Sequence, residues 1–353
     1  MRKLTRRELL LYLGAGLSTV TLNQLLAACG IKPNTALSPT EQPTTLSRPP
    51  TPTPFQATAA STLTSTTHAE SAPTPTSKPA PKQNPYMVVA RGGQPEAMVR
   101  QAIDALGGMQ QFVPRGANVI IKPNICVAYH SYEYAATTNP WVVGALVKLC
   151  LEAGAGSVKV MDSPFGGTPT EAYKISGIQD QVNAAGGQME FMRAIKYVTT
   201  KIPQAVNLTS TEIYDDILKA DVLINVPIAK THDLARLTLG MKNMMGVIKE
   251  RTRLHFDLGN CLTDLNSRVH STLTVIDAVR ILTRNGPTGG NLDDVKQLNT
   301  IIASPDIVAA DSYGATLFGM KPEDLDYIKV ATARGLGRSD LNNLKIQEIS
   351  VGA

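Results

Sequence analysis

The sequence predicts an α/β fold of three layers, with a largely parallel β-sheet flanked by helices on both faces. Short apolar runs rich in β-branched residues alternate along the chain with longer segments of helical periodicity. Strands joined by helical crossovers run parallel, and the crossovers cover both faces of the sheet. The chain has 353 residues, of which 43% are hydrophobic and 18% charged, so it carries enough apolar side chains for a large buried core.

Each element is predicted from its local pattern. The run 117–121 is β-branched and lies between Gly116 and Pro123, which predicts a buried strand, whereas 95–106 has apolar residues at helical spacing. The expected strands are 87–90, 117–121, 157–161, 221–226 and 298–303. The expected helices are 95–106, 141–153, 178–185, 213–220, 270–282, 307–317 and 323–333.

Residues 1–28 are predicted to be an export signal that is removed from the mature chain. Arg6 and Arg7 precede an apolar stretch and a group of small residues, in the order typical of such signals. The paired arginines resemble the twin-arginine export signal, and Leu26-Ala27-Ala28-Cys29 resembles the lipobox of bacterial lipoproteins. These resemblances imply a lipid on Cys29 that anchors the protein on the extracytoplasmic face of a bacterial membrane. An ordinary N-terminal anchor helix is the alternative.

Residues 29–84 are predicted to be a disordered tether between the lipid anchor and the α/β domain at 85–353. The segment is rich in Thr, Ser and Pro and poor in large apolar side chains, so it cannot offset the entropy cost of ordering. A plain spacer and a glycosylated stalk both fit this composition. After position 30 no run of eighteen apolar residues occurs, so we expect a soluble body rather than a polytopic membrane protein.

Charge and cysteine content exclude several classes of function. The formal net charge of +5 comes from the first 84 residues, which leaves residues 85–353 neutral. A neutral body argues against nucleic-acid binding, which needs a basic face. Cys126, Cys150 and Cys261 are too few for an all-thiolate zinc site or a ferredoxin-type cluster, so no iron–sulfur cluster is expected. Buried small hydrophobes are the simplest interpretation of these cysteines.

Polar side chains follow three of the predicted strands. In α/β sheets, ligands bind beyond the carboxyl ends of strands. This rule selects Lys122 and Asn124, then Asp162, and then the loop after 221–226. Asp162 is a candidate for binding a cation or a ribose hydroxyl, whereas Asp277 and Asp311 are expected in helices with solvated or capping roles.

Basic and imidazole side chains concentrate between positions 230 and 255. The segment contains Lys230, His232, Lys242, Arg253 and His255 among apolar residues and glycines. Lysines suit phosphate or carboxylate, and a histidine can act as acid, base or metal ligand near neutral pH. Asn243 follows Lys242, and Gly240 and Gly246 would let backbone N–H groups approach a ligand. The concentration predicts an anion site, although each residue taken alone also fits a structural role.

Several stretches resemble the domain of unknown function 362 family, whose members are often labelled iron–sulfur centre proteins. The resemblance rests on 119–124, Thr138-Asn139-Pro140, Asp162-Ser163-Pro164, 220–232, 238–246, Gly286-Pro287 and 306–311. Many members carry an added ferredoxin module with cysteine pairs, which this sequence lacks. The resemblance therefore implies the fold but no iron–sulfur cluster.

A second resemblance is to the amino-terminal domain of the lactate racemase family, which holds a nickel-pincer nucleotide. The matching positions are His232, Lys242 and His255. The resemblance implies that Lys242 anchors the cofactor and that His232 or His255 is a metal ligand or a proton carrier. Asn243 after the lysine departs from the family pattern, and an upstream paired histidine has no clear match unless His130 serves.

Three hypotheses about function follow. In the first, the protein is an extracytoplasmic lipoprotein enzyme or cofactor protein that acts on a small carboxylate or phosphorylated substrate. Its candidate catalytic and metal-ligating residues are His232 and His255, and its candidate cofactor-binding residues are Lys122, Asn124, Asp162, Lys230, Lys242 and Asn243. In the second, it is a non-catalytic lipoprotein that binds a small anionic ligand and works with a membrane partner. In the third, the domain is purely structural.

Overall fold

The computed structural model describes residues 84–352. The expected export signal, the tether up to residue 83 and the lipidation site Cys29 lie outside the described residues. Within 84–352, no helix has the length and apolar character needed to cross a membrane.

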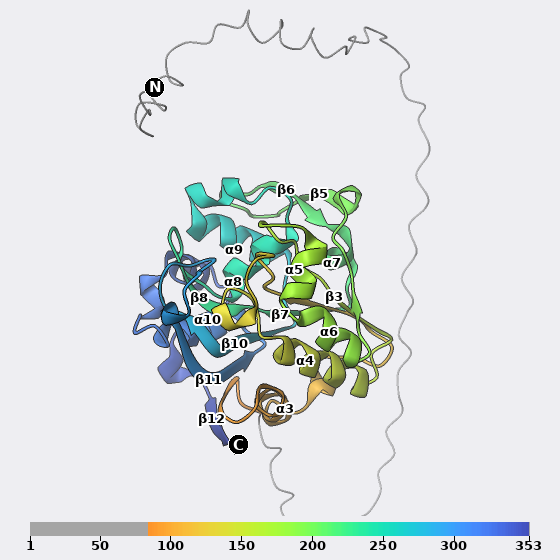
Figure 1. Cartoon of the computed structure of the whole chain (residues 1–353). Coiled ribbons are helices and arrows are strands. Elements are labelled where there is room, and N and C mark those ends of the chain that lie inside the picture. Colours follow the sequence, from red (N-terminus) through yellow and green to blue (C-terminus); the bar gives the residue numbers. More distant parts are fainter. Residues whose placement is uncertain (1–83, 353) are drawn as a thin grey trace, which may run out of the picture. The chain divides into compact units, whose positions relative to one another are not determined.

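One large sheet runs through the described domain, and it confirms the predicted α/β class (Figure 1). Along the sheet the strands follow the order β12-β1-β11-β10-β7-β2-β3-β4, with the β8–β9 hairpin paired to β10. Neighbouring strands along this order are parallel except where β11 pairs with β1 and with β10. The strands are β1 Met87–Gly92, β2 Asn118–Pro123, β3 Ser157–Val160, β4 Gln188–Met189, β7 Val222–Val226, β8 Ile228–His232, β9 Arg236–Thr238, β10 Leu273–Leu282, β11 Val295–Ser304 and β12 Ile346–Val351.

Helices cover both faces of this sheet, as the sequence predicts. In β1, Val88 packs in a core with α3 and α4, while its neighbours Met87 and Val89 pack in the opposite core with α9 and α10. This alternation is expected for a strand whose two faces are both buried. The helices are α3 Pro95–Ala105, α4 Pro140–Glu152, α5 Pro169–Ile175, α6 Ile178–Ala184, α7 Asp215–Lys219, α8 Gly240–Asn243, α9 Leu258–Arg268, α10 Ile307–Thr316 and α11 Asp326–Ala333.

The prediction of a helix over 270–282 was wrong, because this segment forms the strand β10. β10 lies between β7 and β11 and is buried along almost its whole length. A strand buried on both faces has a continuous apolar run, which periodicity alone does not separate from a buried helix.

The prediction of a helix over 213–220 was only partly right. The strand β6 Ser210–Tyr214 ends inside this range and α7 begins after it, and β6 pairs with β5 Tyr197–Lys201 in a small separate sheet. The β8–β9 hairpin and helix α9 were not predicted. The hairpin matters most for the site, because it carries Lys230 and His232.

The carboxyl ends of β2, β3 and β7 lie side by side. Lys122 in β2 is in register with Asn225 in β7, and β2 pairs with β3 on its other side. Lys122, Asp162 and Asn225 are therefore brought to one edge of the sheet, where parallel α/β proteins bind ligands.

Candidate functional site: a cationic pocket

A pocket of about 310 Å³ lies at this edge of the sheet. All eight residues predicted as catalytic or cofactor-binding line it, so the structure brings them together although they span positions 122 to 255. The lining consists of Lys122, Asn124, Cys126, Asp162, Ser163, Phe165, Lys230, His232, Thr238, Lys242, Asn243, Met245, Gly246, Arg251, Thr252, His255 and Pro287. We refer to it below as the cationic pocket.

Positive charge exceeds negative charge in the cationic pocket. Four cationic side chains line it, namely Lys122, Lys230, Lys242 and Arg251, against the single carboxylate of Asp162. That carboxylate pairs with the Lys122 ammonium at 2.6 Å. Among the residues that the structure describes, the other three cations form no ion pair with a carboxylate. A group of buried cations without acidic partners is costly, and an anionic ligand would supply the missing charge.

Lys242 is the most available of the buried cations. The residue is only 7% exposed, and the one hydrogen bond of its Nζ within residues 84–352 is to the Met245 thioether, at 3.3 Å. Burial, together with the charges of Lys230 and Arg251, lowers the pKa of Lys242 to about 8. Because a thioether is a weak acceptor, the ammonium retains donors for an oxyanion.

The Lys230 ammonium is held by neutral acceptors. It donates to the Asn124 amide at 3.0 Å and to the Ala136 carbonyl at 2.6 Å, and it contacts Cys126 Sγ at 3.3 Å. These bonds fix the position of the charge without neutralising it. Lys230 therefore contributes a positive field to the pocket from a rigid position.

A chain of side-chain amides connects the floor of the pocket. Asn243 Oδ1 accepts from Lys122 Nζ at 3.1 Å and from Asn124 Nδ2 at 2.9 Å. Asn243 Nδ2 donates to Asn225, and Asn225 donates to the Gly240 carbonyl. Since these polar atoms are committed to one another, Asn124 and Asn243 position the cations and have little capacity left for a ligand.

Asp162, which was expected to bind a cation or a ribose hydroxyl, also has both carboxylate oxygens bonded within the protein. One oxygen accepts from Lys122, and the other accepts from the Ile125 backbone N–H at 2.6 Å. Desolvation lowers the pKa of Lys122, and the Asp162 charge opposes this effect. Asp162 thus serves as the internal counter-ion of Lys122.

His232 and His255 face each other across 6.0 Å between ring centroids. The His232 Nδ1 accepts from the backbone N–H groups of Leu234 at 3.1 Å and Ala235 at 3.4 Å. Burial and the Lys242 charge lower the pKa of His232 to about 3, so the ring is neutral. A neutral imidazole that accepts at Nδ1 carries its proton on Nε2, and His232 is therefore a hydrogen-bond donor through Nε2.

His255 has the opposite tautomer. Its Nδ1 lies 3.2 Å from the Thr252 carbonyl, which can only accept, so Nδ1 carries the proton and Nε2 carries the lone pair. Burial, with the Lys242 charge, lowers the pKa of His255 as well. The two rings thus present one Nε2 that can donate to a ligand, on His232, and one that can accept from it, on His255.

Two glycines predicted to bring backbone close to a ligand instead make room for protein side chains. A Cβ on Gly246 would overlap the Asp162 carboxylate and lie 2.5 Å from Lys122 Nζ, and one on Gly240 would lie 2.7 Å from Asp311 Oδ1. A side chain at either position would therefore displace a charged group that supports the pocket.

Asp277 and Asp311 are fully buried, so neither is solvated; the expected helical position is wrong for Asp277 and right for Asp311, which also has a capping role. Asp277 lies in strand β10, and desolvation raises its pKa to about 6. Asp311 lies in α10 and accepts from the Gly240 and Met241 backbone N–H groups at 2.6 and 2.8 Å, and desolvation raises its pKa to about 7. Asp311 therefore holds the start of α8, the short helix that carries Lys242 and Asn243.

Sequence reasoning missed several lining residues. Arg251 lines the pocket, whereas Arg253 from the same segment is exposed and does not. Cys126 also lines the pocket, although Cys150 and Cys261 are buried in the two cores as expected for small hydrophobes. The position of Cys126 close to the predicted strand-end loop was the available signal. Nothing in the local pattern distinguishes Arg251 from Arg253.

Comparison with known proteins places the chain in a family. Residues 119–316 match the domain of unknown function called DUF362. The chain belongs to the DUF362 family. This confirms the family resemblance of the sequence, and the match contains all eight predicted site residues.

Three further similarities were found. The thylakoid-associated protein sll1697 of Synechocystis is 25% identical over 249 residues, covering 68% of this chain and 75% of that protein. The lactate racemase apoprotein from Thermoanaerobacterium thermosaccharolyticum is 13% identical with a TM-score of 0.42, covering 67% of this chain and 58% of that one. A Thermotoga maritima protein is 10% identical with a TM-score of 0.36, covering 64% of this chain and 60% of that one. The chain thus spans less than two thirds of either solved structure.

Proposed function

We propose that this DUF362 protein binds a small anionic ligand, a carboxylate or phosphorylated compound, in the cationic pocket and catalyses proton transfer on it. The observation that carries the proposal is the set of three cations, Lys230, Lys242 and Arg251, that lack a carboxylate partner within residues 84–352. A ligand with one or two negative charges would neutralise this excess and contact the free donors of Lys242.

The histidine pair supports the catalytic part of the proposal. His232 Nε2–H is suited to donate to an oxygen on which negative charge develops, because a neutral imidazole can act as an electrophile. His255 Nε2 has a free lone pair and is suited to accept a proton. The surrounding cations would stabilise the anionic intermediate that proton removal next to a carboxylate produces.

The alternative is that the protein binds the ligand without catalysis. Substitution of a histidine distinguishes this alternative from an enzyme. In an enzyme, His255→Gln abolishes turnover by removing the base, while anion binding persists because the cations remain. A protein that only binds would show no turnover in either form.

A nickel-pincer-type nucleotide is a second candidate for the occupant of the pocket. No group of three or more His, Cys, Asp or Glu side chains suited to a metal ion exists in 84–352, and His232 presents an N–H rather than a lone pair. The donor set therefore suits a cofactor that brings most of its own metal ligands. Lys242 would hold such a group and His255 Nε2 would ligate its metal. Elemental analysis and mass spectrometry of the natively purified full chain would detect it, and Lys242→Met should abolish its retention.

The anion proposal is tested by titrating the full chain with sulfate in a calorimeter. Lys242→Met should weaken sulfate binding about tenfold or more, because it removes a charge-assisted hydrogen bond. Lys329→Met, the same change at an exposed lysine of α11, is the matched control and should leave the affinity unchanged. Equal affinities for the wild type and the Lys242→Met protein would refute the proposed role of the pocket.

We further propose that the protein is an exported lipoprotein attached to a membrane through Cys29. The support is the signal-like pattern of residues 1–28 together with a relative named as thylakoid-associated.

A further inference from the structure

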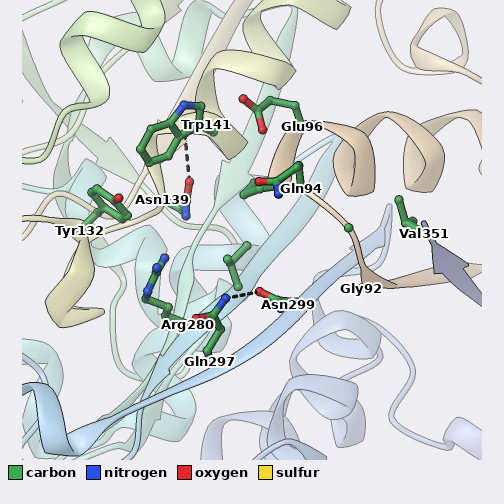
Figure 2. A pocket seen from close by; sticks show the side chains of 13 residues that line it. Gly92, Gln94, Glu96, Tyr132, Asn139, Trp141, Arg280, Gln297, Asn299 and Val351 are labelled. Atoms are coloured by element: carbon green, nitrogen blue, oxygen red, sulfur yellow. Dashed lines mark hydrogen bonds between the residues drawn. The ribbon is translucent and has the colours of Figure 1, made fainter. Parts of the chain in front are cut away.

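A second cavity, of about 640 Å³, shares no lining residue with the cationic pocket. It lies where the β1–α3 turn, the start of α4 and the strands β10 and β11 meet (Figure 2). Its lining consists of Gly92, Gly93, Gln94, Pro95, Glu96, Tyr132, Asn139, Trp141, Val279, Arg280, Gln297, Asn299 and Val351. We call it the aromatic cavity because Tyr132 and Trp141 line it.

Asn139 presents an unpaired donor to the aromatic cavity. The residue is only 4% exposed, and its Oδ1 accepts from the Trp141 backbone N–H at 3.0 Å. This bond fixes the orientation of the amide, because only the oxygen can accept. The Nδ2 group has no hydrogen-bond partner in the part of the chain that the structure describes, and in Figure 2 it points away from Trp141 towards the open space beside Arg280. This donor lines the cavity and is therefore available to a ligand acceptor there.

Arg280 supplies a charge at the same place. Its guanidinium carbon lies 5.4 Å from the centroid of the Tyr132 ring. Within 84–352, Arg280 forms no side-chain hydrogen bond and no ion pair. A guanidinium stacked on an aromatic ring keeps its N–H edges free, and that edge matches the two oxygens of a carboxylate.

The aromatic side chains form one wall of the cavity. Tyr132 and Trp141 meet edge to face with 5.0 Å between ring centroids. Trp141 is only partly buried, so part of its ring surface is open to a ligand. Glu96, an exposed residue in the first turn of α3, lies at the rim of the cavity. Its carboxylate would repel a second negative charge on the ligand, which favours a ligand with a single carboxylate.

We propose that the aromatic cavity is a second ligand site, for a small planar aromatic or heteroaromatic carboxylate. The carboxylate accepts from the Arg280 guanidinium and from Asn139 Nδ2, and the planar ring packs against Trp141. The proposal goes beyond the anion-binding function and uses none of the residues on which that function depends.

The chain contains a single tryptophan, and Trp141 lines both this cavity and a neighbouring pocket between α3, α4 and α6, so its fluorescence reports binding at either and the Arg280 variants assign the signal to the aromatic cavity. We would titrate the full chain with benzoate and compare two matched probes: benzamide, which is planar but neutral, and cyclohexanecarboxylate, which is charged but not planar. Benzoate should change the Trp141 emission with saturation and bind about tenfold more tightly than either probe. Inorganic sulfate, which suits the cationic pocket, should leave the emission unchanged.

Two variants locate the effect. Arg280→Gln should weaken benzoate binding about tenfold, and Arg280→Lys should weaken it severalfold because a lysine keeps the charge but loses the planar fork. Lys242→Met, in the cationic pocket, should have no effect. The Arg280→Lys protein keeps the test decisive if Arg280→Gln fails to fold.

The proposal would be overturned by any of three results. The first is no saturable change in emission with benzoate. The second is equal affinity for benzoate, benzamide and cyclohexanecarboxylate, or an affinity that the Arg280 variants do not change. The third is a loss of benzoate binding in Lys242→Met as large as in Arg280→Gln, which would place benzoate in the cationic pocket.

Discussion

At the scale of single residues, the side chains of the cationic pocket form two groups. Some bond to one another, and others remain available to a ligand. Lys122 and Asp162 neutralise each other, whereas within the described domain the Lys242 ammonium hydrogen-bonds only to a thioether. The sequence predicted both lysines as equivalent candidates, because it carries no record of which carboxylate reaches which ammonium. Their different roles follow from the pairing of β2 with β3, which brings Asp162 next to Lys122.

The pH dependence of anion binding should reveal Lys242. Its pKa is lowered to about 8, so the ammonium is present at pH 7 and lost as the pH rises through 8. Sulfate affinity should therefore fall about tenfold as the pH rises from 7 through 8 and above. Protonation of His232 should not contribute near neutral pH, because the pKa of His232 is lowered to about 3.

Calorimetric titrations across this pH range would measure the effect. In Lys242→Met the fall in affinity at alkaline pH should disappear. A fall in affinity at alkaline pH that is as large in Lys242→Met as in the wild type would contradict the assignment of this titration to Lys242.

At the scale of elements, the pocket depends on short segments that local patterns describe poorly. The strand β8 and the four-residue helix α8 carry Lys230, His232 and Lys242. Their positions are set by tertiary contacts, such as the bonds from Asp311 to the start of α8, rather than by propensity. The longer elements α3, α4, β2 and β7 were predictable because each contains a sustained apolar pattern with clear boundaries.

A side chain at Gly246, in the turn after α8, should lower the stability of the protein. Gly246→Ala would push a methyl group into the Lys122–Asp162 pair, and overpacking of this kind costs about 1–3 kcal/mol of the free energy of unfolding. Denaturant unfolding of the two proteins would measure the difference. Gly352→Ala, at a position with no atom within 4 Å of the added carbon, is the control and should stay within about 0.5 kcal/mol of wild type. A Gly246→Ala protein as stable as wild type would show that the ion pair can move aside.

At the scale of the whole molecule, the sequence was sufficient to predict the α/β class, the family and the edge of the sheet where polar residues gather. The rule that ligands bind beyond the carboxyl ends of strands was enough to select Lys122, Asn124 and Asp162. The aromatic cavity was not predictable, because Arg280 in β10 lies far along the sequence from Asn139 and Trp141 at the start of α4. The mistaken helix over 270–282 concealed the strand that brings Arg280 to this cavity.

Attachment through Cys29 is a prediction about the whole chain. Expressed in a bacterium, the protein should fractionate with membranes, and Cys29→Ser should move it to the soluble extracytoplasmic fraction because the lipid supplies the affinity. Fractionation before and after a high-salt wash, followed by mass spectrometry of the N-terminal peptide, would check this. A Cys29→Ser protein that stays on washed membranes would refute a lipid anchor at this residue.

The most direct test of the central claim is a crystal structure of the protein grown with selenate, an analogue of sulfate whose selenium scatters anomalously. The account predicts an anomalous peak inside the cationic pocket, within hydrogen-bond distance of Lys242 Nζ, that is absent in Lys242→Met crystals. Selenate bound only at surface positions, with none beside Lys242, would contradict the claim that the pocket is built to hold an anion.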